Sequence, residues 1–254
     1  MSRFSLKCVV YVERLIVMLY AKNVRHTHIS HQTHRCKNGS NSPLIDILLV
    51  MKLLISVIMI LFLQVGGADN EQSILAQDLV QYKDNIKEAV DNGVFFLLIC
   101  GAYQLFGKYY KGVDGNLIPG LEVFDYYTVA NPDRKKRCIG NIVVETILGN
   151  DNFKTKVIGF ENHGGQTFDI SNSFGKVLFG NGNKFGDSEE GFFKNNVIAT
   201  YLHGPLLSKN PELCDYIIKY CLDRKYNENI SLESLNDDFE NLCRNQLLNR
   251  FCGP

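Results

Sequence analysis

A long apolar run from Leu44 to Val65 is the first strong pattern in the chain. Its inner part, Ile55 to Val65, leads into Gly66-Gly67, which is typical of a central parallel strand that is buried on both faces and feeds a loop. The alternative is a targeting signal, because residues 51–68 begin with Met-Lys, continue with apolar residues and end on small ones. The apolar core from Leu53 to Leu63 is short for a membrane span, which needs about twenty residues, so we favour the strand.

The segments that follow extend this strand into an α/β pattern. Residues 71–92 place apolar side chains at near-helical spacing between charges, and Asn92-Gly93 closes the segment, so an amphipathic helix is expected. Phe95 to Ile99 is a short apolar strand that runs into Cys100-Gly101, after which a second helix is expected to begin. Short connections between these elements predict an α/β fold in which a mainly parallel sheet is covered by helices on both faces.

Further along the chain, apolar runs alternate with polar, glycine-rich loops such as Gly180 to Asn183. We expect these runs to be strands: Ile142 to Ile147, Lys156 to Phe160, Lys176 to Leu178 and Asn196 to Tyr201. Pro211 is expected to open a helix, and residues 231–249 to form another. The chain is thus divided into an atypical basic segment (1–50), one domain (51–225) and a helical C-terminal tail (226–254).

The charge pattern sets the first segment apart from the rest. The chain has 27 basic and 27 acidic residues, and this balance does not point to nucleic acid as a partner. Residues 1–40 hold seven basic residues and the single acid Glu13, which leaves 20 basic and 26 acidic residues elsewhere, a net charge of −6. The first segment is either disordered or a replacement for a strand and helix of the fold.

Eight cysteines are too few for a disulfide scaffold in 254 residues, and none are spaced as Cys-x-x-Cys. This favours a reducing compartment and gives no support for a zinc site of cysteines. A histidine-rich cluster is the remaining candidate metal site, but it has no hydrophobic periodicity around it to fix the ligands, and we predict no metal: His26, His28, His31, His34 and Cys36.

Cys100 and His203 are the candidate catalytic pair. A cysteine between a buried strand and the start of a helix lies on a sharp turn, where the helix dipole favours its thiolate and the Gly101 N–H can face an oxyanion. His203 follows the apolar strand that ends near Leu202 and precedes Gly204-Pro205. This places it at the sheet edge where open α/β folds gather their sites, and it would supply the base that a thiol nucleophile needs.

Three separated segments carry a resemblance to a known family: Ile99 to Gln104 (ICGAYQ), Gly159 to Gly165 (GFENHGG) and Thr200 to Pro205 (TYLHGP). They resemble class I glutamine amidotransferase domains of the cobyric-acid-synthase-like group and, within that group, the glutamine amidotransferase subunits of lipid II isoglutaminyl synthase. The similarity runs from about Gly66 to Asp223.

The resemblance implies a role for each matching residue. Cys100 would form a glutamyl thioester and release ammonia, with His203 as general base and then acid. Backbone N–H groups of Gly101 and of the loop that contains Gly67 would form the oxyanion hole. The glutamine site is expected to contain Gln104, Arg137, Asn162, His163 and Gly164, with the Arg137 guanidinium on the substrate carboxylate.

Two positions depart from the family pattern and leave an alternative open. Ala102 stands where the nearest relatives have glycine, and Val65 stands where relatives begin a glycine triplet. With the unusual residues 1–50, these differences are the basis for a second hypothesis, a non-catalytic homologue that acts as a binding subunit. Action on a carboxylate other than that of lipid II is a further alternative.

By the same resemblance, L-glutamine is the substrate, and ammonia passes to a Mur-ligase-like synthetase subunit in a heterodimer, which amidates D-glutamate in lipid II for peptidoglycan synthesis. No cofactor is expected in this chain, which lacks a Gly-x-x-x-x-Gly-Lys-Ser/Thr phosphate loop; ATP and Mg²⁺ belong to the partner. A cytoplasmic location is expected, with membrane contact only through the partner's lipid-linked acceptor, unless residues 51–68 act as a signal.

Overall fold

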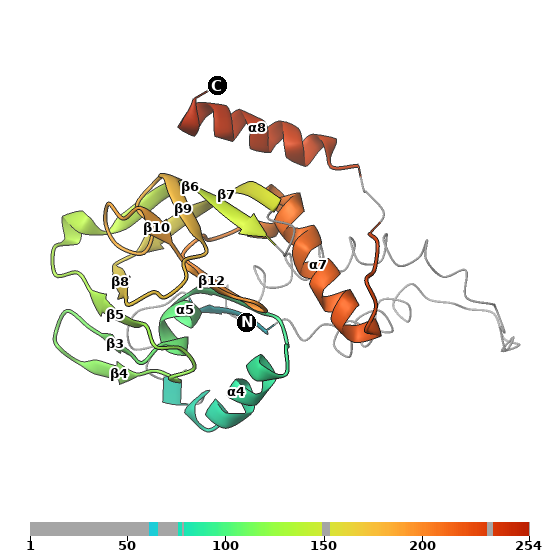
Figure 1. Ribbon diagram of the computed structural model, residues 1–254. Helices are drawn as coiled ribbons and strands as arrows, with labels where there is room; N and C mark the ends of the chain where they lie inside the picture. Colours follow the sequence, from blue (N-terminus) through green and yellow to red (C-terminus); the bar gives the residue numbers. More distant parts are fainter. Residues whose placement is uncertain (1–60, 66–75, 78, 149–152, 233–235, 254) are drawn as a thin grey trace, which may run out of the picture.

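The computed structural model describes residues 61–65, 76–77, 79–148, 153–232 and 236–253 (Figure 1). The predicted basic segment 1–50, the histidine-rich cluster and the glycine loop with Gly67 lie outside these residues, as does most of the 51–68 segment. The described elements follow in chain order: β1 (Leu61–Val65), α4 (Lys83–Asp91), β2 (Phe96–Cys100), α5 (Gly101–Phe106), β3 (Tyr109–Lys111), β4 (Leu117–Pro119), β5 (Tyr127–Ala130), the 3-10 helix η1 (Arg134–Lys136), β6 (Cys138–Leu148), β7 (Phe153–His163), β8 (Gly165–Phe168), β9 (Gly175–Phe179), β10 (Glu189–Glu190), β11 (Phe192–Lys194), β12 (Val197–Thr200), α6 (Leu206–Lys209), α7 (Pro211–Tyr226) and α8 (Asp238–Cys252).

The central sheet has the strand order β1-β2-β12-β11. β1 and β12 both pair in parallel with β2, whereas β11 is antiparallel to β12. Every residue of β2 and of β12 is buried, as expected for parallel strands that helices cover on both faces. The predicted α/β class is confirmed, and so are the strands expected over 95–99 and 196–201. Of the strand expected over 55–65, residues 61–65 are described and form β1.

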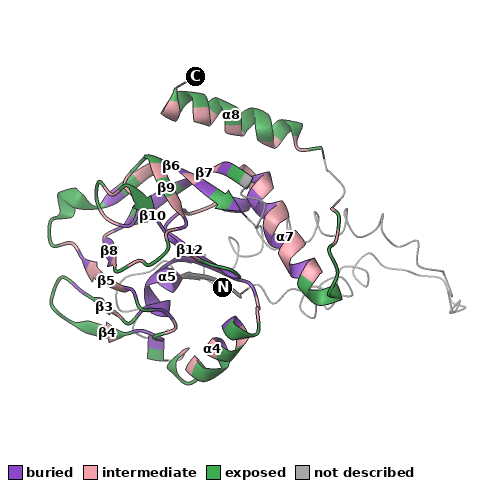
Figure 2. Cartoon of the chain, viewed as in Figure 1, coloured by how far each residue is buried: buried purple, intermediate pink, exposed green. Residues whose placement is uncertain are grey.

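Helices close this sheet into one apolar core (Figure 2). The ring of Phe95 packs edge-on against Tyr220 of α7, with ring centroids 5.4 Å apart. On another side, α4 buries Ile86 and Val90. The buried Asn196 amide donates to the carbonyls of Val90 and Val94, so it ties the end of α4 to the start of β12.

Two further four-stranded sheets are found among the described residues, with strand orders β10-β9-β6-β7 and β4-β3-β5-β8. They are mainly antiparallel, a feature that the sequence pattern did not predict. The hairpin β6–β7 pairs eleven residues on each side, so both strands are longer than the apolar runs that indicated them.

Glu161 to Gly165 (ENHGG) have the polar side chains and glycines that are typical of a loop, but a loop prediction for this segment is wrong. β7 continues through His163, which pairs with Cys138, and β8 begins at Gly165. Glu161 and His163 are buried and Asn162 between them is exposed, which is the alternation of a strand. The sequence did not predict this part of the strand, because a run of polar residues is usually taken to indicate a loop.

The predicted helices are present with different bounds. Within 71–92, the regular helix α4 starts only at Lys83, after a turn at residues 81–82. Pro211 is the first residue of α7, as expected for proline in the first helical turn. The predicted helix over 231–249 is α8, Asp238–Cys252, none of whose residues are buried.

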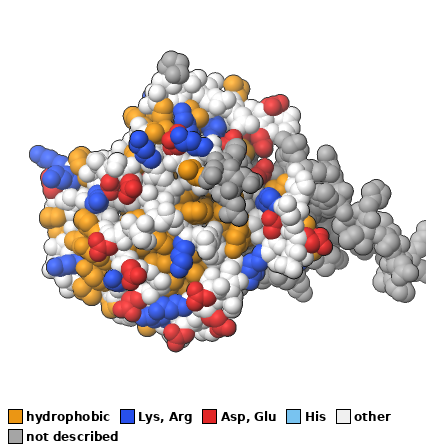
Figure 3. Space-filling view, in the orientation of Figure 1, with side chains coloured by type: hydrophobic (Ala, Val, Ile, Leu, Met, Phe, Trp, Pro, Cys, Tyr) orange, Lys and Arg blue, Asp and Glu red, His pale blue; other side chains and the backbone are white. Residues whose placement is uncertain are grey.

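Charged side chains of both signs are interspersed with hydrophobic ones over the face drawn in Figure 3. No helix within the described residues is both long enough and apolar enough to cross a membrane.

Candidate active site

Cys100 lies on a sharp turn between β2 and α5. Its backbone has φ 56° and ψ −109°, in a region that side chains other than glycine rarely adopt, and α5 begins at the next residue. A strained residue at a strand-to-helix junction is the geometry of a nucleophile elbow, which presents a side chain above the edge of the sheet. The predicted turn at Cys100-Gly101 is present, and the helix starts at Gly101, one residue earlier than expected.

His203 lies at the same edge of the central sheet. It follows β12, which pairs with β2 so that Thr200 is opposite Ile99. Cys100, the last residue of β2, and His203, three residues after the end of β12, therefore lie at the carboxyl ends of two neighbouring parallel strands. The His203 N–H donates to the Phe160 carbonyl at 2.8 Å, and this bridge fixes its backbone against β7.

Burial raises the pKa of the Cys100 thiol to about 11. Two neighbours act in the opposite direction: the Gly101 N–H hydrogen bonds to the sulfur, and the positive charge of Arg137 favours the thiolate. Because burial is the larger effect, the isolated thiol keeps its proton at neutral pH, and nucleophilic attack requires a base to accept it.

The side chains of Tyr201 and His163 pack against each other beside the predicted catalytic residues. Their rings stack with centroids 3.6 Å apart and an interplanar angle of 5°. Cys100 contributes to the raised pKa of Tyr201, and His203 lowers the pKa of His163, so the stacked pair interacts electrostatically with both predicted catalytic residues.

His163 is a neutral imidazole. Its Nδ1 lies 2.7 Å from the Gly165 carbonyl, which can only accept, so Nδ1 carries the hydrogen. Burial is the main cause that lowers its pKa to about 4; His203 and Arg137 contribute in the same direction, and backbone hydrogen bonds to Gly165 and Gly182 oppose the shift. The Gly165 carbonyl, at the start of β8, thus holds His163 in one tautomer.

Gln104 projects from α5 into the same region. It is buried, and its Nε2 donates to the Tyr201 hydroxyl at 3.2 Å. A Cβ at Gly165 would lie 2.5 Å from Gln104 Nε2, so the glycine allows the start of β8 to approach α5 closely. Gln104 is therefore part of the buried surface beside Cys100.

Arg137 follows η1 and contacts the C-terminal end of β7, the end that also carries His163. Its Nε and Nη2 atoms both donate to Asn162 Oδ1, at 3.2 and 3.0 Å, and a Cβ at Gly164 would lie 3.1 Å from Nη1. Arg137 and Asn162 are both exposed, so the guanidinium keeps donors available to solvent.

The predicted site residues within the described part of the chain thus converge at one end of the central sheet. Cys100, Gly101 and Gln104 come from the elbow, His203 from the end of β12, and the rest from the junctions of β6, β7 and β8: Arg137, Asn162, His163 and Gly164. Gly67 lies outside the described residues.

Two buried residues behind the site were missed by the sequence analysis. Tyr201 was read as the last residue of a strand, but it stacks on His163. Glu190 accepts hydrogen bonds from the Tyr201 N–H at 2.7 Å and from the Thr200 hydroxyl, and burial raises its pKa to about 8. In sequence, Glu189-Glu190-Gly191 is typical of a solvated turn. The buried position of the Glu190 carboxyl follows only from the pairing of β10 with β9 and from the hydrogen bonds to Thr200 and Tyr201.

A cysteine elbow beside a histidine on the neighbouring strand defines the class: an α/β protein with a site of the cysteine-nucleophile type. The chain belongs to the family of CobB/CobQ-like glutamine amidotransferase domains, whose model matches residues 58–211. This confirms the family resemblance of the three motifs.

Named relatives fall into two groups. The chain is 42% identical over 160 residues to the lipid II isoglutaminyl synthase (glutamine-hydrolyzing) subunit GatD of Staphylococcus aureus, covering 63% of each chain. It is 39% identical over 174 residues to the Streptococcus pneumoniae subunit of the same name, covering 68% of this chain and 65% of the relative. A probable cobyric acid synthase of Methanococcus maripaludis is 32% identical over 163 residues, covering 60% of this chain and 30% of the relative. The matches thus span slightly less than two thirds of the GatD subunits.

Proposed function

We propose that the chain is a glutaminase subunit that hydrolyses the side-chain amide of L-glutamine. The observation that carries this proposal is the register of β2 and β12, which brings Cys100 and His203 to the same sheet edge within a glutamine amidotransferase domain. The identity to subunits named glutamine-hydrolyzing supports it.

The proposed reaction starts with transfer of the Cys100 proton to His203. The thiolate attacks the amide carbon, and the Gly101 N–H donates to the oxyanion that forms. The imidazolium then protonates the leaving nitrogen, ammonia departs, and a glutamyl thioester remains on Cys100. His203 next removes a proton from water, which attacks the thioester and releases glutamate and the free thiol.

Glutamine is proposed to bind between the elbow and the end of β7. Arg137 would pair with the α-carboxylate, since Asn162 already orients its guanidinium and leaves other N–H groups available. Gln104, His163 and Gly164 would line the side-chain pocket, and the loop with Gly67 would add a second donor to the oxyanion hole.

Ammonia is proposed to pass to a Mur-ligase-like synthetase subunit that amidates D-glutamate in lipid II. The names of the two GatD relatives support this acceptor, while the probable cobyric acid synthases support the alternative of another carboxylate. ATP and Mg²⁺ would bind the partner. Residues 51–225 are proposed as the amidotransferase domain, 1–50 as a basic segment and 226–254 as a helical tail, in a cytoplasmic heterodimer.

Packing at Ala102 bears on the alternative of a non-catalytic homologue. Ala102 is 1% exposed and belongs to the apolar core on α5. Its methyl group therefore fills core space, which favours the catalytic proposal over the binding subunit.

The test uses a glutamine analogue that alkylates thiols, 6-diazo-5-oxo-L-norleucine, and mass spectrometry of the full chain. We expect a single adduct on Cys100 and ammonia release from glutamine, both lost in Cys100→Ser. Cys214→Ser is the matched control, since Cys214 is a buried cysteine on α7 outside the site. Ammonia release that survives in Cys100→Ser would overturn the proposal.

A further inference from the structure

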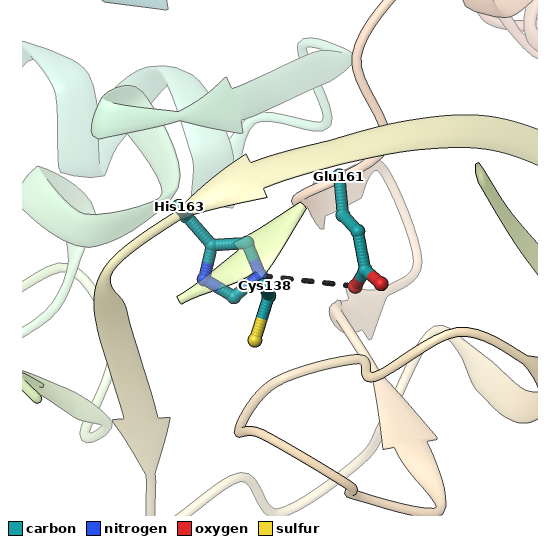
Figure 4. Close-up of side chains that lie close together, drawn as sticks. All are labelled: Cys138, Glu161 and His163. Carbon is teal, nitrogen blue, oxygen red and sulfur yellow. Dashed lines mark ion pairs between the residues drawn. The ribbon is translucent and has the colours of Figure 1, made fainter. Parts of the chain in front are cut away.

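Three side chains of types that bind metal ions in proteins, Cys138, Glu161 and His163, lie close together at the junction of β6 and β7 (Figure 4). Cys138 is the first residue of β6 and His163 the last of β7, and the two are paired across the hairpin. Glu161 lies two residues before His163 on the same face of the strand. Their ligand atoms are all within 4.8 Å of one another, and the residues are at most 2% exposed.

His163 presents a free lone pair to this cluster. The Gly165 carbonyl accepts the hydrogen of Nδ1, so Nε2 has none and can only accept or ligate. Nε2 is buried, makes no hydrogen bond of normal geometry among the described residues and lies 4.0 Å from Glu161 Oε2, with the backbone of Gly182 as a further polar neighbour of the ring. A backbone carbonyl on one imidazole nitrogen is the usual outer-shell arrangement of a metal-binding histidine.

The Glu161 carboxylate is also held by hydrogen bonds, in this case from the loop that follows β9. Its Oε1 accepts from the N–H and the side-chain amide of Asn181, at 2.9 and 2.8 Å, and Oε2 accepts from the Gly182 N–H at 3.1 Å. These neutral donors fix the carboxylate but leave its negative charge unpaired. Oε2 retains a second lone pair for a ligand.

The chemistry of the donors fits a zinc-type cation. A thiolate, a carboxylate and a neutral imidazole carry two negative charges, which a divalent ion neutralises even beside the positive charge of Arg137. Ligand atoms around a tetrahedral zinc ion lie about 3.3–3.8 Å apart, so the 4.0 Å separation of Nε2 and Oε2 would shorten by about half an ångström. We propose that Cys138, Glu161 and His163 bind one divalent cation of the zinc type, with one further position for water.

This site is distinct from the proposed catalytic pair and does not depend on glutamine hydrolysis. It nevertheless shares His163 with the proposed glutamine pocket, and its other ligands adjoin that pocket in sequence: Arg137 precedes Cys138, and Asn162 lies between Glu161 and His163. A bound ion would therefore fix the strand ends that carry the Arg137–Asn162 hydrogen bonds.

The experiment is a titration of the reduced, metal-free full chain with Cd²⁺, followed by thiolate-to-metal absorption, and with Zn²⁺, followed by thermal unfolding. We expect one ion per chain, a thiolate band and a raised Tm. Cys138→Ser and His163→Gln should each remove the band or weaken binding at least about tenfold. Circular dichroism would establish that at least one of the two variants is folded.

Two controls separate this site from other thiols and imidazoles. Cys214→Ser removes a buried thiol elsewhere, and a full-length variant with His26, His28, His31 and His34 replaced by Asn removes the histidine-rich segment. Both should keep the band and the stoichiometry. The proposal is overturned if the wild-type chain shows no saturable thiolate band, or if a folded Cys138→Ser or His163→Gln variant binds Cd²⁺ with the same band and the same affinity as the wild-type chain.

Discussion

At the scale of single residues, the charge of Arg137 is the feature of the site that is most accessible to measurement. Burial raises the pKa of Cys100 to about 11, and Arg137 opposes this increase. Below that pKa the thiolate fraction rises tenfold for each pH unit, so alkylation of Cys100 by iodoacetamide should rise roughly tenfold per unit between about pH 7 and 10.

Replacement of Arg137 by Met should raise the pKa of Cys100 further and slow its alkylation at each of these pH values. Rates would be measured for the Cys100 peptide by mass spectrometry. Arg134→Met is the matched control, because Arg134 is an exposed residue of η1 and does not appear among the charges that act on Cys100. An equal effect of both substitutions would mean that Arg137 acts only through net charge.

Residues with distinctive chemistry were the predictable part of the site. Cys100 and His203 each follow a short apolar strand, so sequence patterns place both at a sheet edge. Tyr201 and Glu190 were not predictable in the same way, since their roles come from a ring stack and from hydrogen bonds that only the folded chain creates. Cys138 showed no chemistry in sequence because its ligand partners lie more than twenty residues away.

At the scale of elements, Glu190 links β10 to the turn that carries His203. Its carboxyl accepts from the Tyr201 N–H and the Thr200 hydroxyl, and its pKa is about 8 because of burial, with a smaller effect from Glu161. The folded state thus binds its proton more tightly than the unfolded state, whose pKa is near the ordinary value of 4.5. Stability contributed by the protonated form is complete below about pH 4.5 and is lost as the pH rises towards 8.

Glu190→Gln should remove this pH dependence. Glutamine retains an acceptor for the Tyr201 N–H and gains a donor for the Thr200 hydroxyl, without a charge to bury. The variant should therefore gain stability relative to wild type as the pH rises from about 5 to 9, in denaturant titrations at each pH. Glu189→Gln is the control, because Glu189 is the neighbouring residue and its side chain is exposed. A constant difference between wild type and Glu190→Gln over this range would contradict the assignment.

The bounds of elements show what a local pattern leaves out. Strand cores such as Ile142 to Ile147 were predicted from apolar runs, but β6 extends from Cys138 to Leu148 because β7 supplies hydrogen-bond partners along its whole length. Pairing of this kind is a contact between distant segments, and it determines where a strand ends more than the side chains at its ends do.

At the scale of the whole molecule, the α/β class followed from strands that alternate with helices, whereas the two antiparallel sheets did not. Their strands are short or polar on one face, as in β8 and β9, and their order depends on which segments meet in space. The spacing of apolar residues along the chain does not predict the order of strands in a sheet.

The relation of α8 to the rest of the chain gives the last prediction. None of its residues are buried (Figure 2). Arg244 Nη2 nevertheless donates to the Lys156 carbonyl at 2.6 Å and pairs with Glu212 at 3.2 Å, and Phe251 stacks on Phe179. α8 is thus attached to β7, α7 and β9 through the side chains of Arg244 and Phe251, and residues 226–229, where the connection begins, are exposed.

Arg244→Ala should release α8, because it removes the hydrogen bond to the backbone of β7 together with a partly exposed ion pair that alone is worth about 1 kcal/mol or less. We expect chymotrypsin, which does not cleave at arginine, to cut the segment between α7 and α8 several times faster, while residues 76–226 stay protected. Arg250→Ala, on the exposed last turn of α8, should leave the rate nearly unchanged. If instead the whole chain is degraded in Arg244→Ala, α8 is an integral part of the fold and the division at residue 225 is wrong.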